Sequence, residues 1–337
     1  MQRLHKSDRS ETARVMHGGP RRWNAYASVR PLTRRRRRNP VTRTVSSRAI
    51  RKAVVPVAGV GTRLFPATKS QPKEMLPVGR KPVVQYVVEE LRTAGVEQIL
   101  LITGRKKAAI EDHFDADLEL SQVLHQAGSV DPADLPIADG IRGVFYTRQG
   151  TPSGVADAVG LARDFAGGEP FVVAFGDTII HGGDLVARLM AAHRESGASG
   201  AVAVEQIAPE DAFRYGIVDV RDVDGSLVAV NLVEKPAAGR APSDLAIVPR
   251  YVFESSIFDA IEATRPGLGG ERWLTDSIAI LARESPPVRV VPLESNERRY
   301  DIGNFASYYR AFIDFALADP QYGAGVRQYV SELGQRL

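Results

Sequence analysis

A short apolar stretch that runs directly into a glycine loop constrains this chain more than any other feature. Three valines predict a buried strand over 53–58, because β-branched residues favour strands. The chain then reads Gly-Val-Gly-Thr-Arg over 59–63. Glycines carry no Cβ, so such a loop can turn sharply and point its backbone N–H groups at an anion. With the cations of Arg63 and Lys73 nearby, the loop predicts a binding site for a nucleoside triphosphate.

The loop matches neither of the two commonest glycine-rich phosphate motifs. A dinucleotide-binding fingerprint requires G-x-G-x-x-G, and Leu64 stands in place of the third glycine. The string G-x-x-x-x-G-K-[ST] of a Walker loop does not occur in the chain. Taken alone, the segment could also be an ordinary connection after a strand, so its interpretation depends on the rest of the sequence.

Strand and helix patterns alternate from residue 52 onward, which favours a mostly parallel sheet wrapped by helices. We expect strands at 53–58, 98–103, 141–147, 170–175, 200–206, 216–221, 226–234, 245–253 and 288–294, and helices at 82–94, 105–114, 115–127, 154–165, 183–195, 255–264, 274–284 and 303–317. After residue 210 the pattern changes, since Asp224-Gly225 predicts an antiparallel hairpin. The predicted fold class is α/β, with a Rossmann-like, mostly parallel mixed sheet flanked by helices and a smaller antiparallel portion.

These patterns divide the chain into three segments. Residues 51–318 are expected to form the main domain, with a nucleotide-binding part over about 51–206 and a second part over 207–318. Residues 1–50 are predicted to be a disordered leader, and residues 319–337 a C-terminal tail.

The charge of the chain is unevenly distributed. Residues 1–52 contain 16 Lys and Arg against 2 Asp and Glu, whereas the remainder contains 28 basic and 38 acidic residues. The five arginines at 34–38 are typical of a solvated tail, and an arm for nucleic acid or an anionic surface or a targeting peptide are the alternatives. Because the body is acidic, we expect no nucleic-acid binding by the folded domain.

Composition excludes several classes of chemistry. The chain has no cysteine, so disulfides, thiolate metal sites and cysteine nucleophiles are ruled out, and a reducing, cytoplasmic location is expected. No apolar run approaches the roughly 18 residues that a membrane span requires, so no membrane partner is expected.

Two aspartates are candidates for a metal site. Asp177 follows the apolar run 170–175, and ligands of open α/β sheets bind where such strands end. A carboxylate there can hold Mg²⁺, although an aspartate after a glycine can also be a simple surface turn. Asp301 ends a strand-rich segment just before a helix, where the plain alternative is a helix N-cap.

Several motifs together resemble one enzyme family. The G-x-G-T-R loop is followed after ten residues by Pro72-Lys73, and the remaining motifs then come in the family's order. They are Glu111-Asp112-His113-Phe114-Asp115, Arg148-Gln149-Gly150, Glu234-Lys235-Pro236, Leu274-Thr275-Asp276 and Asp301-Ile302-Gly303-Asn304. On these motifs, from residue 52 to about 318, the chain resembles the sugar-1-phosphate nucleotidylyltransferases, and most of all the bacterial branch that uses UTP and glucose 1-phosphate. The resemblance implies the nucleotide-diphospho-sugar transferase fold, with residues 207–318 binding the sugar phosphate.

The resemblance also implies a role for each matching residue. The nucleotide-binding set is Ala58, Gly59, Gly61, Thr62, Arg63, Lys73, Gln149 and Gly154, and the sugar-phosphate set is Gly216, Glu234 and Lys235. Asp177 and Asp301 are implied as the Mg²⁺ ligands, and Arg63, Lys73, Asp177 and Lys235 as the catalytic residues. The implied reaction joins UTP to glucose 1-phosphate with release of pyrophosphate, in a homo-oligomer that is a dimer or tetramer.

Three departures from the family pattern leave the choice of base open. The segment 154–158 lacks the histidine usual in this branch, Gly176-Asp177-Thr178 is closer to thymidylyltransferases, and Glu271-Arg272-Trp273-Leu274 replaces Glu-Ile-Gln-Leu. A thymidylyltransferase or another enzyme of the family is therefore the nearest alternative. A non-catalytic regulatory relative is a more distant one, since all the expected cations and carboxylates are present.

Overall fold

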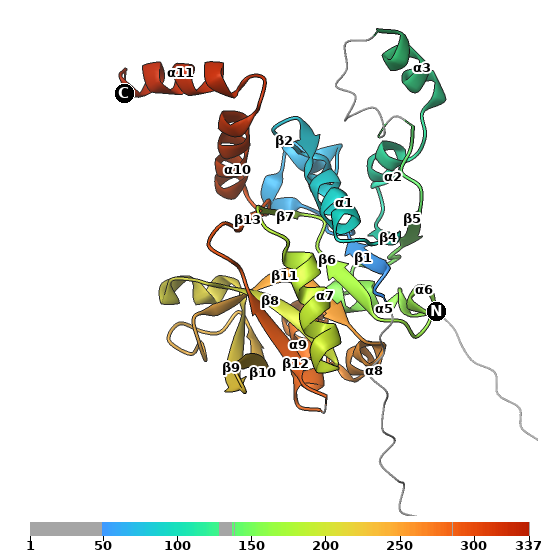
Figure 1. Cartoon of the computed structure of the whole chain (residues 1–337), viewed down its shortest axis with the longest axis vertical. Helices are drawn as coiled ribbons and strands as arrows, with labels where there is room; N and C mark the ends of the chain where they lie inside the picture. Colours follow the sequence, from blue (N-terminus) through green and yellow to red (C-terminus); the bar gives the residue numbers. More distant parts are fainter. Residues whose placement is uncertain (1–48, 128–136, 138, 285, 337) are drawn as a thin grey trace, which may run out of the picture. The chain divides into compact units, whose positions relative to one another are not determined.

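The computed structural model describes residues 49–127, 137, 139–284 and 286–336 (Figure 1). All of them belong to one unit, Val45–Leu337. The predicted leader, apart from its last two residues, and most of the predicted loop 128–140 lie outside the described residues.

Nine strands of the described part form one mixed sheet, in the order β5-β4-β1-β6-β11-β8-β12-β10-β9. Their bounds are β1 Lys52–Pro56, β4 Gln98–Thr103, β5 Val144–Arg148, β6 Phe171–Ala174, β8 Gly200–Gln206, β9 Gly216–Val223, β10 Ser226–Glu234, β11 Leu245–Phe253 and β12 Val288–Pro292. Strands β5, β4, β1 and β6 pair in parallel, as do β12 and β8, whereas β11, β10 and β9 pair antiparallel with their neighbours. The predicted α/β class with a mixed sheet is thus confirmed, and the antiparallel strands continue the same sheet.

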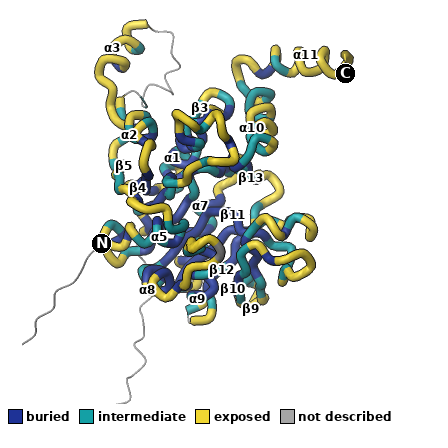
Figure 2. The backbone as a smooth tube through the Cα atoms, turned by 180° about the vertical axis from the view of Figure 1, so that it is seen from behind, coloured by how far each residue is buried: buried dark blue, intermediate teal, exposed yellow. Residues whose placement is uncertain are grey.

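Helices cover both faces of this sheet. Helices α1 (Val83–Thr93), α2 (Ala108–Phe114) and α7 (Leu185–Ser196) share one apolar core, and α5 (Val155–Gly160), α8 (Ser256–Ala263) and α9 (Leu274–Ala282) share the other. Along β1 the side chains of Ala53 and Val55 belong to the first core, and that of Val54 to the second. This alternation is the period of two that a strand imposes. The dark central strands of Figure 2 show how fully the sheet is buried.

Some elements differ from the sequence prediction. The expected helix 154–165 is split into α5 and α6 (Arg163–Ala166), because Gly160, a poor helix former, ends α5. The segment after β1 contains three short 3₁₀ helices, at Thr62–Leu64, Ala67–Lys69 and Lys73–Met75, where the sequence predicted only a loop.

Two small two-stranded sheets were also not predicted. Strand β2 (Pro77–Val78) pairs with β3 (Lys81–Pro82), and β7 (Thr178–His181) pairs antiparallel with β13 (Arg298–Asp301). A third apolar core joins these two sheets to α10 (Phe305–Ala318). The N-cap of α10 is Asn304, whose side chain accepts a hydrogen bond from Ser307 N. The predicted N-cap role therefore falls to Asn304 and not to Asp301.

The C-terminal segment and α3 are mostly exposed. The tail predicted for 319–337 contains a helix, α11 (Gly323–Gly334), that contacts α10. Helix α3 (Leu118–Ala127) likewise buries little of its surface. In the described part of the chain no helix has the length and apolar character to cross a membrane.

Candidate active site

A cavity of about 710 Å³ opens where three parallel strands end. The loop Ala58–Arg63 follows β1, Gln149 follows β5 and Asp177 lies shortly after β6. Because β4 and β6 lie on opposite sides of β1, the connections diverge there, and such switch points are where open α/β sheets bind ligands. Every site residue predicted from the sequence lines this cavity: Ala58, Gly59, Gly61, Thr62, Arg63, Lys73, Gln149, Gly154, Asp177, Gly216, Glu234, Lys235 and Asp301.

The glycine loop is held open by its own local contacts. Gly61 adopts a φ of 73°, which a residue with a Cβ rarely adopts, and its carbonyl accepts a hydrogen bond of 2.8 Å from Thr68 Oγ1. A Cβ on Gly59 would lie 3.4 Å from Lys73 Nζ, which is ordinary van der Waals contact. Lys73 therefore lies directly beside the loop, at the position where the sequence predicts a triphosphate.

A second loop, which follows β5, also lines the cavity. Gln149 Nε2 donates to the Gly154 carbonyl at 3.1 Å, and Gly154 has a φ of 109°. The backbone of Arg272 runs against this loop, because Arg272 N donates to Ser153 O at 2.9 Å and Ala156 N donates to Arg272 O at 3.2 Å. Arg272 Nη1 also pairs with an Asp157 carboxylate oxygen at 3.0 Å. The segment at 271–273, which departs from the family pattern, thus holds the loop that the sequence assigns to the base.

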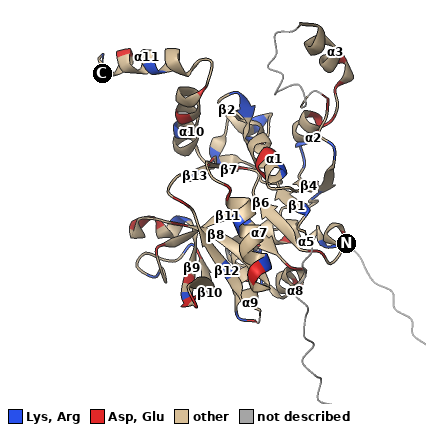
Figure 3. Cartoon of the chain, viewed as in Figure 1, with Lys and Arg blue, Asp and Glu red and all other residues tan. Residues whose placement is uncertain are grey.

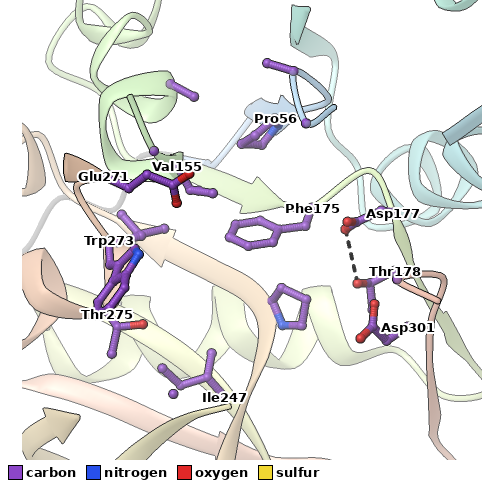
Figure 4. A pocket seen from close by; sticks show the side chains of 18 of the residues that line it. Pro56, Val155, Phe175, Asp177, Thr178, Ile247, Glu271, Trp273, Thr275 and Asp301 are labelled. Atoms are coloured by element: carbon purple, nitrogen blue, oxygen red, sulfur yellow. Dashed lines mark hydrogen bonds between the residues drawn. The ribbon is translucent and has the colours of Figure 1, made fainter. Parts of the chain in front are cut away.

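Asp301 is the last residue of β13, and Asp177 immediately precedes β7, the strand that pairs with β13. Asp301 pairs with Thr178, and Ile302 N donates to the Asp177 carbonyl at 3.0 Å. The two carboxylates lie on the same side of the cavity (Figure 4). Burial raises the pKa of Asp301, and the nearby charge of Asp177 raises it further, although Arg299, Lys73 and Arg63 oppose this shift.

Lys73 places a positive charge against the Asp177 carboxylate. Its Nζ contacts Asp177 Oδ2, and the two residues are far apart in the sequence. Burial by itself would lower the pKa of Lys73, but Asp177, Glu74 and Asp301 together raise it. Burial likewise opposes ionisation of Asp177, yet Lys73 holds the pKa of that carboxyl below its usual range. Lys73 is therefore an ammonium and Asp177 a carboxylate.

The pair of aspartates fits a hard divalent cation. Two carboxylates share one cavity, and after burial the charge of Asp177 is the next cause of the raised pKa of Asp301, so a cation between them would favour ionisation of both. Oxygen donors are what Mg²⁺ and similar ions prefer, and Mg²⁺ commonly uses one or two carboxylates with substrate phosphates completing its shell. Within the described residues no cluster of three or more His, Asp or Glu side chains is arranged to hold a metal without such help.

A buried ion pair lies beside Lys73, and no sequence pattern indicated this pairing. Lys107 Nζ is 2.6 Å from Glu74 Oε2, and both side chains are almost fully buried. Burial raises the pKa of Glu74 and lowers that of Lys107, while each partner opposes the shift of the other. The pair joins the N-terminal end of α2 to the segment that carries Lys73.

The opposite wall of the cavity comes from the antiparallel strands. Thr275 Oγ1 donates to Glu234 Oε2 at 2.7 Å, and Lys235 Nζ lies 3.3 Å from Glu234 Oε1. Lys235 has a φ of 43°, an uncommon conformation for a residue with a side chain. A Cβ on Gly216 would come within 3.0 Å of both Glu234 Oε2 and Thr275 Oγ1, so the glycine keeps this wall open.

Two further residues complete this wall and were given no role from the sequence. Trp273 lines the cavity (Figure 4), and Lys235 Nζ lies 5.6 Å from the centroid of its ring. Arg299 stacks on Tyr215 at 4.4 Å from the ring centroid, donates to the Ile247 carbonyl at 3.1 Å and pairs with Glu205. The sequence marked Trp273 only as part of a departure from the family pattern, and no local motif marks Arg299.

Comparison with known proteins places this geometry in a family. A model of the nucleotidyl transferase family matches residues 52–316. The UTP–glucose-1-phosphate uridylyltransferase of Staphylococcus epidermidis is 39% identical over 287 residues, which cover 84% of this chain and 98% of that protein. A putative enzyme of the same name from Methanocaldococcus jannaschii is 40% identical over 84% of this chain and all of its own. The solved structure of a UTP-bound UGPase from Acinetobacter baumannii matches with a TM-score of 0.76 and 35% identity, over 85% of this chain and 100% of that one.

The chain therefore belongs to the nucleotidyl transferase family, and its own sheet presents a glycine loop and two carboxylates to one cavity. The relatives from Staphylococcus epidermidis and Methanocaldococcus jannaschii, which match it over most of its length, are named as a UTP–glucose-1-phosphate uridylyltransferase and a putative one.

Proposed function

We propose that this enzyme makes UDP-glucose and pyrophosphate from UTP and glucose 1-phosphate. The observation that carries the proposal is one cavity lined by three groups: the glycine loop with Arg63 and Lys73, the carboxylates of Asp177 and Asp301, and the Glu234–Lys235 wall. The first group suits a triphosphate, and the last suits a phosphorylated sugar. The uridylyltransferases that match almost their whole length to this chain support the choice of UTP and glucose 1-phosphate.

The reaction needs no nucleophile from the protein. An oxygen of the sugar phosphate attacks the α-phosphorus of UTP, the bond to the bridging oxygen breaks, and pyrophosphate leaves. Lys235 would hold the attacking phosphate, while Arg63 and Lys73 would hold the phosphates that leave. Positioning and charge neutralisation of this kind account for most of the catalysis in transfers at phosphorus.

The paired carboxylates are proposed to bind Mg²⁺. When bound, Mg²⁺ would supply charge neutralisation at the phosphate oxygens. Asp177 and Asp301 would hold the ion, because their side chains lie on one side of the cavity (Figure 4). Glu234, whose orientation is set by Thr275, would accept hydrogen bonds from sugar hydroxyls.

Gly154 provides a first test of the base-binding loop. A Cβ there would lie 2.3 Å from Arg272 O and 2.6 Å from Arg272 N, and the φ of 109° would be strained. We expect Gly154→Ala to displace the loop and weaken UTP binding about 10-fold or more, since a strained residue costs on the order of 1–3 kcal/mol. Isothermal titration with UTP measures the effect. Gly150→Ala is the matched control, because nothing lies within 4 Å of its Cβ, and equal losses in both variants would contradict the assigned role.

Lys235 provides a test of the sugar-phosphate site. We expect Lys235→Met to lower kcat/KM for glucose 1-phosphate about 10- to 100-fold, because a hydrogen bond to a charged group contributes about 1.5–3 kcal/mol. UTP binding should be retained. Lys81→Met is the control, since Lys81 pairs with Glu89 outside the cavity. Loss of UTP binding with an unchanged dependence on sugar phosphate would reverse the assignment of the two phosphate sites.

A substrate panel tests the proposed activity itself. Pyrophosphate release should be fastest with UTP and glucose 1-phosphate when UTP, dTTP and other nucleotides are each combined with several sugar phosphates. Faster turnover with dTTP would assign the chain to thymidylyltransferases, which Gly176-Asp177-Thr178 resembles. No turnover with any pair would favour the regulatory relative.

We also propose where the enzyme works and how many chains it assembles. The absence of cysteine and the need for UTP support a cytoplasmic location. A homo-oligomer, either a dimer or a tetramer, is supported by the exposed apolar side chains of α10 and α11, which are Tyr309, Phe312, Ile313, Tyr329, Val330 and Leu333. Light scattering during size-exclusion chromatography measures the state, and a monomer at working concentration would contradict it.

A further inference from the structure

Arg250 is a charged residue with no access to solvent. It lies in the middle of β11 and its exposed fraction is 0%. Its neighbours Pro249 and Tyr251 line the cavity, whereas Arg250 is not among the described residues that do so. A buried guanidinium is costly unless every donor has a partner, so its partners indicate its role.

Those partners come from a distant helix and from the turn that carries Asp177. Glu90 of α1 receives Arg250 Nε at 3.1 Å on each carboxylate oxygen and Arg250 Nη2 at 2.7 Å. Arg250 Nη2 also donates to the Thr178 carbonyl at 2.8 Å, whereas Nη1 donates to the carbonyl of its chain neighbour Pro249 at 3.0 Å and lies 3.5 Å from the Phe175 carbonyl. The carbonyls of Phe175 and Thr178 flank Gly176 and Asp177, so the guanidinium lies against both ends of the turn and bonds most closely at the Thr178 end.

The turn, residues 175–177, lies between β6 and β7 and belongs to neither strand. Its conformation therefore depends on individual hydrogen bonds and not on the ladder of a sheet. Its remaining backbone bonds are Phe175 N to Pro249 O at 3.2 Å, Gly176 N to Pro56 O at 3.4 Å, Ile302 N to Asp177 O at 3.0 Å and the closing bond of the turn, Thr178 N to Phe175 O, at 3.4 Å. Within the part of the chain that the structure describes, the guanidinium of Arg250 is the only side-chain group that contacts backbone carbonyls on both sides of Asp177. Its planar fork suits this task, and the single ammonium of lysine does not reproduce it.

We propose that Arg250, oriented by Glu90, is a positioning residue that fixes the Asp177 carboxylate for the reaction. The inference rests on the proposed function, in which Asp177 binds the metal ion. Glu90 neutralises the guanidinium and directs its remaining donors toward the turn. Loss of either partner lets the turn relax, so the carboxylate meets a cation in the productive position less often.

Direct metal binding tests the proposal without relying on turnover. The variants Arg250→Lys and Glu90→Gln are titrated with Mn²⁺ in the presence of UTP alone, and free Mn²⁺ is followed by electron paramagnetic resonance. We expect Mn²⁺ affinity and kcat to fall about 10- to 100-fold, as is typical when a partner that orients a metal ligand is lost. The KM for glucose 1-phosphate should be unchanged, because the Glu234–Lys235 wall has no contact with Arg250. Glu90→Gln keeps a hydrogen-bond acceptor, so it provides a milder variant if Arg250→Lys does not fold.

Arg188→Lys is the matched control for general damage. Arg188 of α7 also ties a buried carboxylate, Glu297, to a backbone carbonyl, Pro292 O at 3.0 Å, but it lies outside the cavity lining. This variant should lose thermal stability and keep its Mn²⁺ affinity. If Arg250→Lys and Glu90→Gln behave in the same way, Arg250 has only a structural role and the inference is overturned. Asp177→Asn tests metal binding by Asp177 separately from positioning by Arg250. Unchanged Mn²⁺ affinity in that variant overturns the metal assignment, and the role of Arg250 with it.

Discussion

Replacing Asp177 by alanine is expected to lower kcat about 10²- to 10³-fold, the usual effect of removing a main charge-stabilising contact. Asp177 occupies the turn after β6, contacts Lys73 and lies on the same side of the cavity as Asp301. Among the described residues, no other carboxylate both contacts Lys73 and lies on the same side of the cavity as Asp301. The loss should therefore not be recovered by saturating UTP or glucose 1-phosphate.

Steady-state kinetics at varied Mg²⁺, with thermal melting as a check on folding, measures this effect. Asp177→Asn keeps the shape of the side chain and removes its charge, so it should lose nearly as much activity as Asp177→Ala. Near-normal turnover in a folded Asp177→Ala variant would contradict the assignment of the carboxylate pair.

Lys73→Met is expected to change two affinities in opposite directions. The ammonium contacts Asp177 and would also hold the leaving phosphates, so its loss should weaken UTP binding about 10- to 100-fold, given about 1.5–3 kcal/mol for a charged hydrogen bond. The divalent cation proposed to bind Asp177 would compete with the same ammonium. Without nucleotide, Mn²⁺ should bind the variant about 10-fold more tightly, since coupling within a site is commonly about 1–3 kcal/mol.

Two titrations, one with UTP and one with Mn²⁺ alone, measure these affinities. General damage to the site would weaken both, so the opposite signs distinguish the specific effect. Lys69→Met is the matched control, because Lys69 lies exposed in the same segment and outside the cavity lining, and it should change neither affinity. A Lys73→Met variant with weaker Mn²⁺ binding would contradict the competition for Asp177.

Local pattern was sufficient for most of the sheet. The apolar runs that became β1, β4, β6, β8 and β11 lie within one or two residues of the predicted bounds. The glycine loop and Asp177 could be placed because they directly follow such strands, and strand ends determine where an α/β sheet binds ligands. In Figure 3 these central strands are mostly tan, and the charged residues lie mainly on helices and loops. This contrast between uncharged buried strands and charged exposed segments is what allows strands to be predicted from sequence.

The parts that could not be predicted depend on contacts between distant segments. Asp301 meets Asp177 only because β7 pairs with β13, and both strands are four residues long with little pattern of their own. Arg250 and Glu90 are 160 residues apart, so no spacing rule joins them. Trp273 reaches Lys235 through the packing of α9 on β10. The sequence could nominate the reacting groups, but the residues that orient them become visible only in the folded chain.

The fate of the phosphate oxygens tests the central claim most directly. Glucose 1-phosphate whose non-bridging phosphate oxygens carry ¹⁸O is incubated with unlabelled UTP and Mg²⁺, and both products are analysed by mass spectrometry. Attack by the sugar phosphate on the α-phosphorus predicts that all of the label remains in UDP-glucose and none enters pyrophosphate. Label in pyrophosphate, or formation of no UDP-glucose at all, would contradict the proposed reaction.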